Sequence, residues 1–271
     1  MVRTAIKKIL RYLKIYTILL KFGFIFSTAY RTSFLIQLFV EIGYSFGFIL
    51  FFGVIYSNIR EIAGWSFYEI LFLAGLSIAT SEFLLGAVSI LNLRRLPEKI
   101  KDGDLDPILL KPINSLFNAS LAMPYFTSFI AGLPGFFLML YALNQLGTKI
   151  SPINILVAIF LVGCGLTIAY SIMVIFASLS FVFINATTLP RTGERIMLYK
   201  DRPHDIYQGA LKPIFFFLLP VVYVDSIPSA TILRGIEIKY VLLSPILAFL
   251  FLTGAIKFWG VMIKRYSSAS S

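Results

Sequence analysis

The run INILVAIFLVGCGLTIAYSIMVIFASLSFVFI, residues 153–184, contains no charged side chain. About 20 apolar residues suffice for one helical crossing of a bilayer, so this longer run predicts a tilted or extended membrane helix. The whole chain agrees, since 58% of its 271 residues are hydrophobic and only 14% are charged. One globule cannot hide that much apolar surface. The composition excludes a soluble enzyme, a disordered regulator and a disulfide scaffold, and it predicts a polytopic membrane protein.

Five more apolar runs have the length of a crossing: residues 34–56, 67–91, 117–141, 206–224 and 241–263. The run 206–224 is the least regular, because Lys212, Pro213 and Pro220 lie inside it. The predicted fold class is an all-α membrane protein, with six transmembrane helices in a single domain that covers residues 1–271.

The basic residues are distributed unevenly among the predicted loops. With the N-terminus in the cytoplasm, the segments 1–33, 92–116 and 185–213 and the C-terminal end hold 20 of the 24 Lys and Arg residues. Cytoplasmic loops of membrane proteins carry such an excess, so we expect both termini to be cytoplasmic. These loops account for the net charge of +11. No nucleic-acid partner is predicted, because the chain has no separate basic domain.

The N-terminal residues 1–20 place basic and apolar side chains on opposite faces of a helix. This pattern is typical of an amphipathic helix that lies on a membrane surface and contacts lipid. We expect residues 1–31 to form this interfacial helix and its connector to the first crossing. The helix is either a lipid anchor alone or a lever that moves the first crossing.

Residues with catalytic chemistry are scarce. The chain has no Gly-Lys dipeptide, so it lacks a phosphate-binding loop for ATP. His204 is the only histidine and Cys164 the only cysteine. The spacing Asp102-x-Asp104-x-Asp106 resembles the start of a calcium loop, but the glycine and glutamate that such a loop needs are missing. We therefore expect no catalytic site, no metal site and no cofactor in this chain.

The cytoplasmic loop 92–116 is dense in charge and interrupted by Pro97, Gly103, Pro107 and Pro112. The spacing of Leu93, Leu96 and Ile100 predicts a short helix with one apolar face, and Asp106 before Pro107 is typical of a helix N-cap. Such an element suits docking to a soluble partner. The alternative is a solvated connector.

The next predicted cytoplasmic segment, 185–212, contains Arg191, Arg195, Lys200 and Arg202, which we expect to contact anionic lipid headgroups or the same partner. His204 is expected to be solvated. Prolines on both sides of Asp225 predict a re-entrant segment at residues 225–240, on the outer side of the last two crossings.

Carboxylates inside a membrane usually face a bundle interior or a water-filled cavity. Glu41 and Glu82 lie inside predicted crossings, whereas Glu69 lies near one end. One hypothesis is that Glu41 and Glu82, together with Tyr44, line a substrate path that attracts a cationic group. The alternative is that the carboxylates make structural hydrogen bonds between helices.

Three stretches carry a family resemblance. They are IKDGDLDPILLKPIN at 100–114, the proline-rich stretch 202–235 and the tail RYSSAS at 265–270. With its six predicted crossings, the sequence resembles the permease subunits of bacterial ATP-binding-cassette exporters, in the type-two export-permease superfamily.

The resemblance implies a dimer of two permeases, identical or related, in the inner membrane of a bacterium. It also implies separate ATPase subunits that bind ATP and Mg²⁺, and a coupling helix that docks into them. That element is expected within 93–111, and the residues assigned to coupling are Arg94, Arg95, Glu98, Lys99, Gly103, Asp104, Leu105, Asp106 and Lys111.

Two other classes of protein remain open from the sequence. An ion- or proton-coupled secondary transporter would use Glu41 and Glu82 as relays and would work without ATP. A non-transporting membrane anchor would only recruit a cytoplasmic complex. A drug, a lipid-linked glycan, a peptide and a dye all remain open as substrates.

Overall fold

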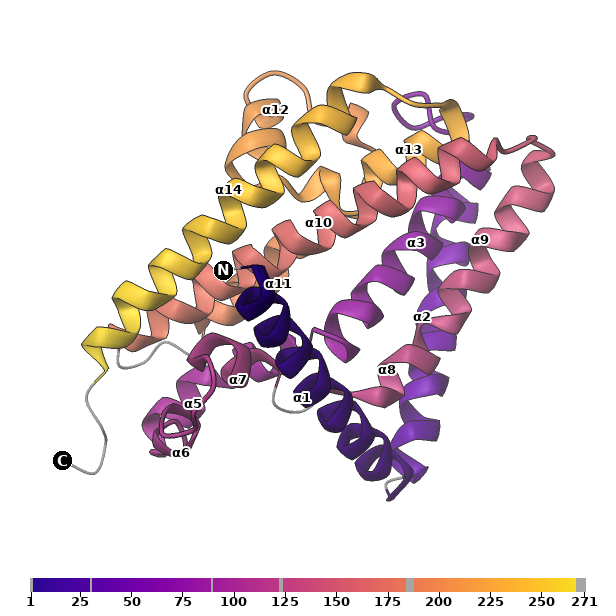
Figure 1. Ribbon diagram of the computed structural model, residues 1–271. Helices are drawn as coiled ribbons and strands as arrows, with labels where there is room; N and C mark the ends of the chain where they lie inside the picture. The colour runs from indigo at the N-terminus through magenta and orange to yellow at the C-terminus, as the bar shows by residue number, and fades with distance from the viewer. Residues whose placement is uncertain (1, 30, 89, 122–123, 184–187, 267–271) are drawn as a thin grey trace.

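The computed structural model describes residues 2–29, 31–88, 90–121, 124–183 and 188–266. These residues form helices and connecting turns, and the described ranges contain no β-strand beyond one isolated bridge between Ile62 and Trp65. The long helices cross one another obliquely, while short helices gather at two opposite ends of the bundle (Figure 1). The predicted all-α class is confirmed.

Four helical stretches of the described chain are long and apolar enough to cross a membrane: Phe67–Leu84, Thr127–Leu146, Pro152–Phe181 and Ile238–Arg265. They are built from α3 (Phe67–Gly86), α8 (Phe126–Ala131), α9 (Leu133–Leu146), α10 (Pro152–Ser178), η1 (Leu179–Phe181), α14 (Ile238–Met262) and η5 (Ile263–Arg265). The predicted crossings at 67–91, 153–184 and 241–263 therefore correspond to long apolar helices.

Two further helices lie at the N-terminal end of the chain. They are α1 (Val2–Ala29) and α2 (Arg31–Tyr56). α2 covers the predicted first crossing, and within its described residues Phe46–Tyr56 form a shorter apolar helical stretch.

The predicted third crossing at 117–141 begins too early. Its first residues belong to the separate helix α7 (Ser115–Leu121), and the long apolar stretch begins at Thr127. The displacement has a local cause, since Pro124 has no N–H to donate to a helix.

The prediction of a fifth crossing at 206–224 is wrong. In its place lie four short helices: η2 (His204–Ile206), α12 (Leu211–Pro213), η3 (Ile214–Leu218) and η4 (Val221–Tyr223). The prolines at 213 and 220 interrupt the apolar run. Helix α13 (Ser226–Arg234) follows inside the predicted re-entrant segment and leads into α14.

Helix α11 (Thr188–Met197) starts the segment whose position differs most from the prediction. Glu194 lies 3.6 Å from Arg94, which follows the C-terminal end of α3. Lys200 then reaches the middle of α3, where its Nζ donates a hydrogen bond to the backbone oxygen of Ser77 at 3.0 Å.

Five residues further on, Asp205 lies at the opposite end of α3. Its Oδ2 accepts a hydrogen bond from Nε1 of Trp65 at 2.8 Å, and α3 begins two residues after that tryptophan. The segment 194–205 therefore runs antiparallel to α3 along its length. The prediction that 185–213 is one cytoplasmic loop is wrong, because residues 194–205 connect the two ends of a helix that is long and apolar enough to cross a membrane.

The charged loop after α3 folds into a compact group of short helices. They are α4 (Ile90–Arg94), α5 (Leu96–Lys101) and α6 (Asp106–Leu109), followed by α7. Leu93, Leu96 and Ile100 pack against the main hydrophobic core, as the spacing predicts. The helix boundary near Asp106 is shifted by one position, since Leu105 is the N-cap and Asp106 the first helical residue.

Helices α3 and α9 approach closely at two glycines. A Cβ atom added to Gly75 would lie 2.6 Å from the backbone oxygen of Gly135, and one added to Gly135 would lie 2.5 Å from the oxygen of Gly75. Small residues permit such backbone contact between membrane helices. This contact holds α9 against one side of α3, and the segment 194–205 lies along α3 as well.

Candidate functional site

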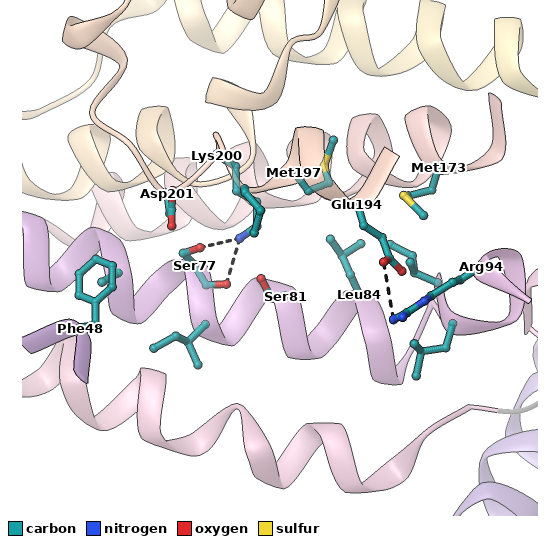
Figure 2. A pocket seen from close by; sticks show the side chains of 15 residues that line it. Phe48, Ser77, Ser81, Leu84, Arg94, Met173, Glu194, Met197, Lys200 and Asp201 are labelled. Atoms are coloured by element: carbon teal, nitrogen blue, oxygen red, sulfur yellow. Dashed lines mark hydrogen bonds and ion pairs between the residues drawn. The ribbon is translucent and has the colours of Figure 1, made fainter. Parts of the chain in front are cut away.

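A pocket of about 440 Å³ lies between α3 and the segment 194–201. Its apolar wall comprises Phe48, Ala74, Ile78, Leu84, Ile90, Leu91, Met173, Met197 and Leu198. Its polar lining comprises Ser77, Ser81, Arg94, Glu194, Lys200 and Asp201. Figure 2 shows the Arg94–Glu194 ion pair at one end of the pocket, and Lys200 and Asp201 toward the other. The charges thus lie at the two ends of an apolar cavity.

Lys200 is held in a buried polar network beside the pocket. Only 3% of the residue is exposed, and its Nζ donates to the backbone oxygen and to Oγ of Ser77, at 3.0 and 2.7 Å, and to Oγ1 of Thr80 at 3.1 Å. The same ammonium group forms an ion pair with Asp225, which is fully buried. Thr80 closes the network by donating to Oδ1 of Asp225 at 2.7 Å.

This network ties together three parts of the chain. Asp225 is the N-cap of α13, Lys200 follows α11, and Ser77 lies in α3. A buried charge is costly unless it is paired and hydrogen-bonded, and here both charges have partners. The expectation that Lys200 contacts lipid headgroups is wrong, because the residue faces the protein interior.

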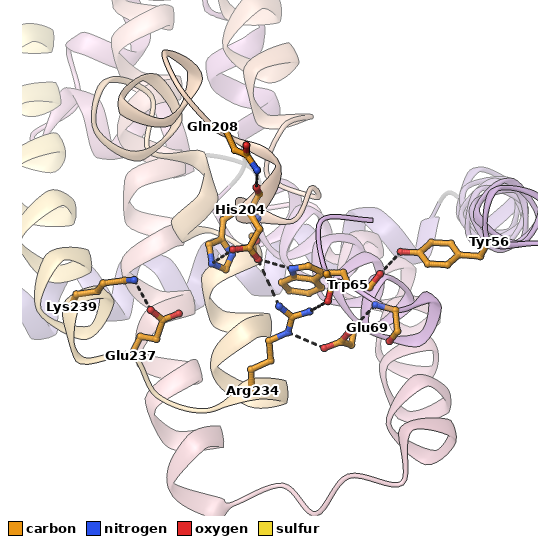
Figure 3. Close-up of polar contacts among 12 residues, drawn as sticks. Tyr56, Trp65, Glu69, His204, Gln208, Arg234, Glu237 and Lys239 are labelled. Atoms are coloured by element: carbon orange, nitrogen blue, oxygen red, sulfur yellow. Dashed lines mark hydrogen bonds and ion pairs between the residues drawn. The ribbon is translucent and has the colours of Figure 1, made fainter. Parts of the chain in front are cut away.

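A second polar network lies at the Trp65 end of α3 (Figure 3). Arg234 donates from Nε to Oε1 of Glu69 at 2.9 Å and from a terminal nitrogen to the oxygen of Gly64 at 2.6 Å. Its guanidinium lies 4.4 Å from the ring centroid of Trp65, a cation–π arrangement. Asp205 completes the network, with Oδ2 3.7 Å from Arg234. The network fastens α13 to the turn before α3.

His204 is buried at the edge of this second network, and the expectation that it is solvated is wrong. Its backbone N–H donates to Oγ of Ser226 at 2.7 Å, and its Nδ1 lies 3.0 Å from the same oxygen. Burial lowers the pKa of His204, and the neighbouring Asp205 opposes this shift. The ring stacks edge-to-face against Trp65 and Tyr240, so the histidine is a packing element of this end.

The predicted substrate-path residues are not brought together in the pocket. Glu82 lies on α3 and is 5% exposed, but it is not among the residues that line the pocket. Glu82 faces the start of α9, because a Cβ atom added to Gly132 would lie 3.3 Å from the Cβ atom of Glu82. The side chains of Glu41 and Tyr44 lie outside the described part of the structure.

The predicted coupling residues lie on the helices α4 to α6 and their turns. Arg94, Arg95, Glu98, Asp104 and Lys111 are exposed, whereas Lys99, Gly103 and Asp106 are partly buried and Leu105 is fully buried. Burial lowers the pKa of Lys99. Gly103 has a φ of +78°, a left-handed conformation that favours glycine in this turn. Leu110 is 85% exposed and forms an apolar tip beside the charged residues.

The loop is held from one side by α1. Arg11 donates to the backbone oxygen of Pro112 at 3.3 Å, and the hydroxyl of Tyr12 accepts from the backbone N–H of Asn114 at 3.0 Å. Tyr12 also packs edge-to-face against Phe117. The N-terminal helix therefore touches the segment that the sequence predicts as the coupling loop.

The end of α14 holds the loop from another direction. The hydroxyl of Tyr266 donates to Oδ1 of Asp106 at 2.9 Å, and Nε1 of Trp259 donates to Oγ of Ser115 at 3.1 Å. Phe181, at the end of the long apolar helix, packs against both aromatic rings. The short helices are thus fixed to three of the long elements.

Of the four charged residues that line the pocket, Arg94 and Lys200 carry other expected roles from the sequence, and the acidic Glu194 and Asp201 carry none. Glu194 and Asp201 are separated by seven positions, about two helical turns, and Met197 and Leu198 between them also line the pocket. This spacing is present in the sequence, but the basic residues around it favour contact with lipid headgroups or a partner. Asp225 at the end of an apolar stretch was the other available signal.

These features define a helical membrane protein with a pocket between its long helices and a structured, charged loop at one end. Within that class, the chain matches the model of the ABC-2 family transporter protein over residues 42–270, and it belongs to this family. It is therefore the permease component of an ABC transporter, a class that works with ABC ATPase subunits. No curated protein and no solved structure matches the chain.

Proposed function

We propose that the protein is the membrane half of an ATP-driven exporter, which forms its translocation path as a dimer and receives motion from ATPase subunits through residues 92–116. The main support for this proposal is that side-chain hydrogen bonds fix the loop both to α1 and to the end of α14. Its tip at Leu110 is left exposed. A loop anchored to several long helices transmits displacement to them, because packed elements move as rigid bodies.

The distribution of charge supports a cytoplasmic position for this loop. We call the end of the bundle at the C-terminus of α3 the Arg94 end, and the end at its N-terminus the Trp65 end. Counted along the chain, seventeen Lys and Arg residues belong to the Arg94 end, and Lys200 lies between the two ends. The Trp65 end carries six: Arg60, Lys149, Arg202, Lys212, Arg234 and Lys239. By the positive-inside rule, the Arg94 end faces the cytoplasm of a bacterium and both termini lie on that side.

The test is a mild-detergent purification of the tagged chain, followed by identification of bound proteins and reconstitution with the ATPase. We expect a stoichiometric ATPase subunit, and we expect Leu110→Asp to abolish its association. The control Ile59→Asp changes an exposed apolar residue of the turn at the other end. A chain that purifies alone, even after cross-linking in membranes, would contradict the proposal and favour a secondary transporter.

A further inference from the structure

The charges that line the pocket are unequally matched. Glu194 lies 3.6 Å from Arg94, whose side chain is 43% exposed, and both residues line the pocket, so their opposite charges balance within its lining. Arg202, by contrast, does not line the pocket. Within the described chain, the ion partner of Asp201 is its neighbour Arg202, whose Nε lies 3.9 Å from Oδ1 and whose side chain is 57% exposed. A contact of this length with an exposed side chain is weak. Asp201 therefore leaves one negative charge at its end of the pocket.

The environment of Asp201 makes that charge costly. The side chain is 22% exposed, but its Oδ1 is buried and makes no hydrogen bond to another described residue. An ionised carboxylate away from water needs a cation or several donors. Figure 2 shows the side chain of Asp201 pointing toward α3, at the end of the pocket where Lys200 lies.

Lys200 does not supply the missing cation, and it is also unavailable to an anion. Its ammonium group has three N–H donors, and it contacts Ser77, Thr80 and Asp225. These contacts engage the donors, and Asp225 neutralises the charge. An anionic ligand would have to break this network or the Arg94–Glu194 pair.

The rest of the pocket suits an apolar body. Phe48, Ile78, Leu84 and Met173 contribute to the wall, and Ser81 contributes a hydroxyl between the charged ends. The volume of about 440 Å³ lies in the range of small-molecule sites, which are mostly apolar with a few polar groups that orient the ligand.

We propose that this pocket binds an amphipathic organic cation, with its charged group against Asp201 and its apolar body along α3 between Phe48 and Leu84. That this ligand is the exported substrate rests on the proposed function, whereas the binding itself requires no ATPase. The proposal narrows the substrate class to molecules that combine a single positive charge with an apolar body of drug-like size.

The experiment compares two probes of the same shape and opposite charge. Binding of radiolabelled tetraphenylphosphonium and of tetraphenylborate is measured at equilibrium on the purified full-length chain in detergent, without ATP. We expect saturable binding of the phosphonium and at least about tenfold weaker binding of the borate, since like charges repel in a desolvated site.

Two variants test the assignment of the residues. Asp201→Asn is expected to weaken phosphonium binding at least about tenfold. Ser81→Leu is expected to abolish it by filling the pocket while the charges stay in place. The matched control Glu61→Gln removes an exposed carboxylate from the turn before Trp65 and leaves binding unchanged. Elution volume and melting temperature show whether each variant is folded.

The outcomes separate this inference from the proposed function. No phosphonium binding to the wild-type chain, equal binding of both probes, or unchanged binding by folded Asp201→Asn would each overturn the cation site. If Asp201→Asn does not fold, the comparison of probes on the wild type and Ser81→Leu still decide. Copurification of an ATPase is unaffected by any of these results, so the permease assignment stands or falls separately.

Discussion

The hydroxyl of Tyr266 donates a hydrogen bond to Oδ1 of Asp106 at 2.9 Å, across 160 positions of the chain. The contact joins the end of the last long helix to the loop that we propose binds the ATPase. Trp259, two turns earlier, makes a second bond to the same group of short helices. The last helix and the loop are therefore positioned to move together.

Removing this hydroxyl is expected to weaken coupling. In Tyr266→Phe the ratio of transported substrate to hydrolysed ATP should fall about fivefold, because one hydrogen bond contributes about 1 kcal/mol net. The measurement is transport and ATP hydrolysis by the reconstituted complex. Tyr141→Phe, a half-exposed tyrosine at the other end, is the control. An unchanged ratio in Tyr266→Phe would show that the hydrogen bond between Tyr266 and Asp106 does not contribute to the coupling of ATP hydrolysis to transport.

The ion pair of Lys200 and Asp225 should behave as a coupled unit. Lys200→Met leaves a fully buried carboxylate without its cation, and breaking such a pair costs about 3–5 kcal/mol. The double variant Lys200→Met/Asp225→Asn should be more stable than the single variant, because it removes the uncompensated charge. The free energies of unfolding of the single and double variants are measured by unfolding in a series of denaturing detergent concentrations. Additive losses would show that the two residues do not interact.

The close contact between α3 and α9 predicts intolerance of a single methyl group. Gly75→Ala should lower the free energy of unfolding by about 1–3 kcal/mol, because the new Cβ would overlap the backbone of Gly135. Gly163→Ala is the matched control, since a Cβ there meets nothing within 4 Å. Equal melting temperatures for the two variants would contradict this packing.

The path of segment 194–205 is open to a labelling test. In a Cys164→Ala background, Arg202→Cys should react with an impermeant maleimide on the same face of the membrane as Arg60→Cys. Arg191→Cys should react on the opposite face. The reason is that residues 194–205 connect the two ends of α3. If positions 191 and 202 are labelled from the same side, the segment does not cross between the ends of α3, and the predicted single loop at 185–213 is correct.

His204 predicts a pH dependence of stability. Burial lowers its pKa in the folded chain, so the unfolded chain binds a proton at higher pH than the folded chain does. Its contribution is therefore complete above the ordinary histidine pKa of about 6.5 and is lost as the pH falls below that value. Between pH 7.5 and 5.5 the free energy of unfolding should fall by roughly 1.4 kcal/mol per pH unit at most, and the melting temperature should fall with it.

The matched variant for this pH dependence is His204→Gln. It should be less stable than the wild type at neutral pH, because it loses ring packing, and its melting temperature should change less with pH. Asp205, Arg234, Glu237 and Lys239 are the charged residues that act on His204, and all four stay in place in this variant. A slope unchanged by the substitution would show that His204 is not the source of the pH dependence.

Much of the architecture is readable from local sequence. The stretches near 67–84, 152–181 and 238–265 are predictable because lipid demands about 20 apolar residues in one helix, which is a property of neighbouring positions. The buried face of Leu93, Leu96 and Ile100 follows from helical spacing in the same way. The exposed coupling residues of this loop were named from a family resemblance, and their role remains a prediction.

The candidate pocket was not readable, because its residues are brought together from positions far apart. When hydropathy is averaged over neighbouring residues, the charge of Lys200 counts against a membrane helix. In the folded chain, Ser77 and Asp225, which lie 123 and 25 positions away, hydrogen-bond to Lys200 and compensate its charge. Local hydropathy also explains why the fifth crossing was predicted at 206–224. That stretch is more apolar than the charged segment 194–205, which runs along α3.

Local sequence is enough to predict an all-helical membrane protein and to locate most of its long helices and its charged loop. Solvent preference and helical periodicity are set by adjacent side chains, so these features need no knowledge of the fold. The pairing of charges, the helix contact through glycine and the position of the pocket depend on the folded arrangement. The energy of a buried charge depends on the distance to its partner, and folding alone sets that distance.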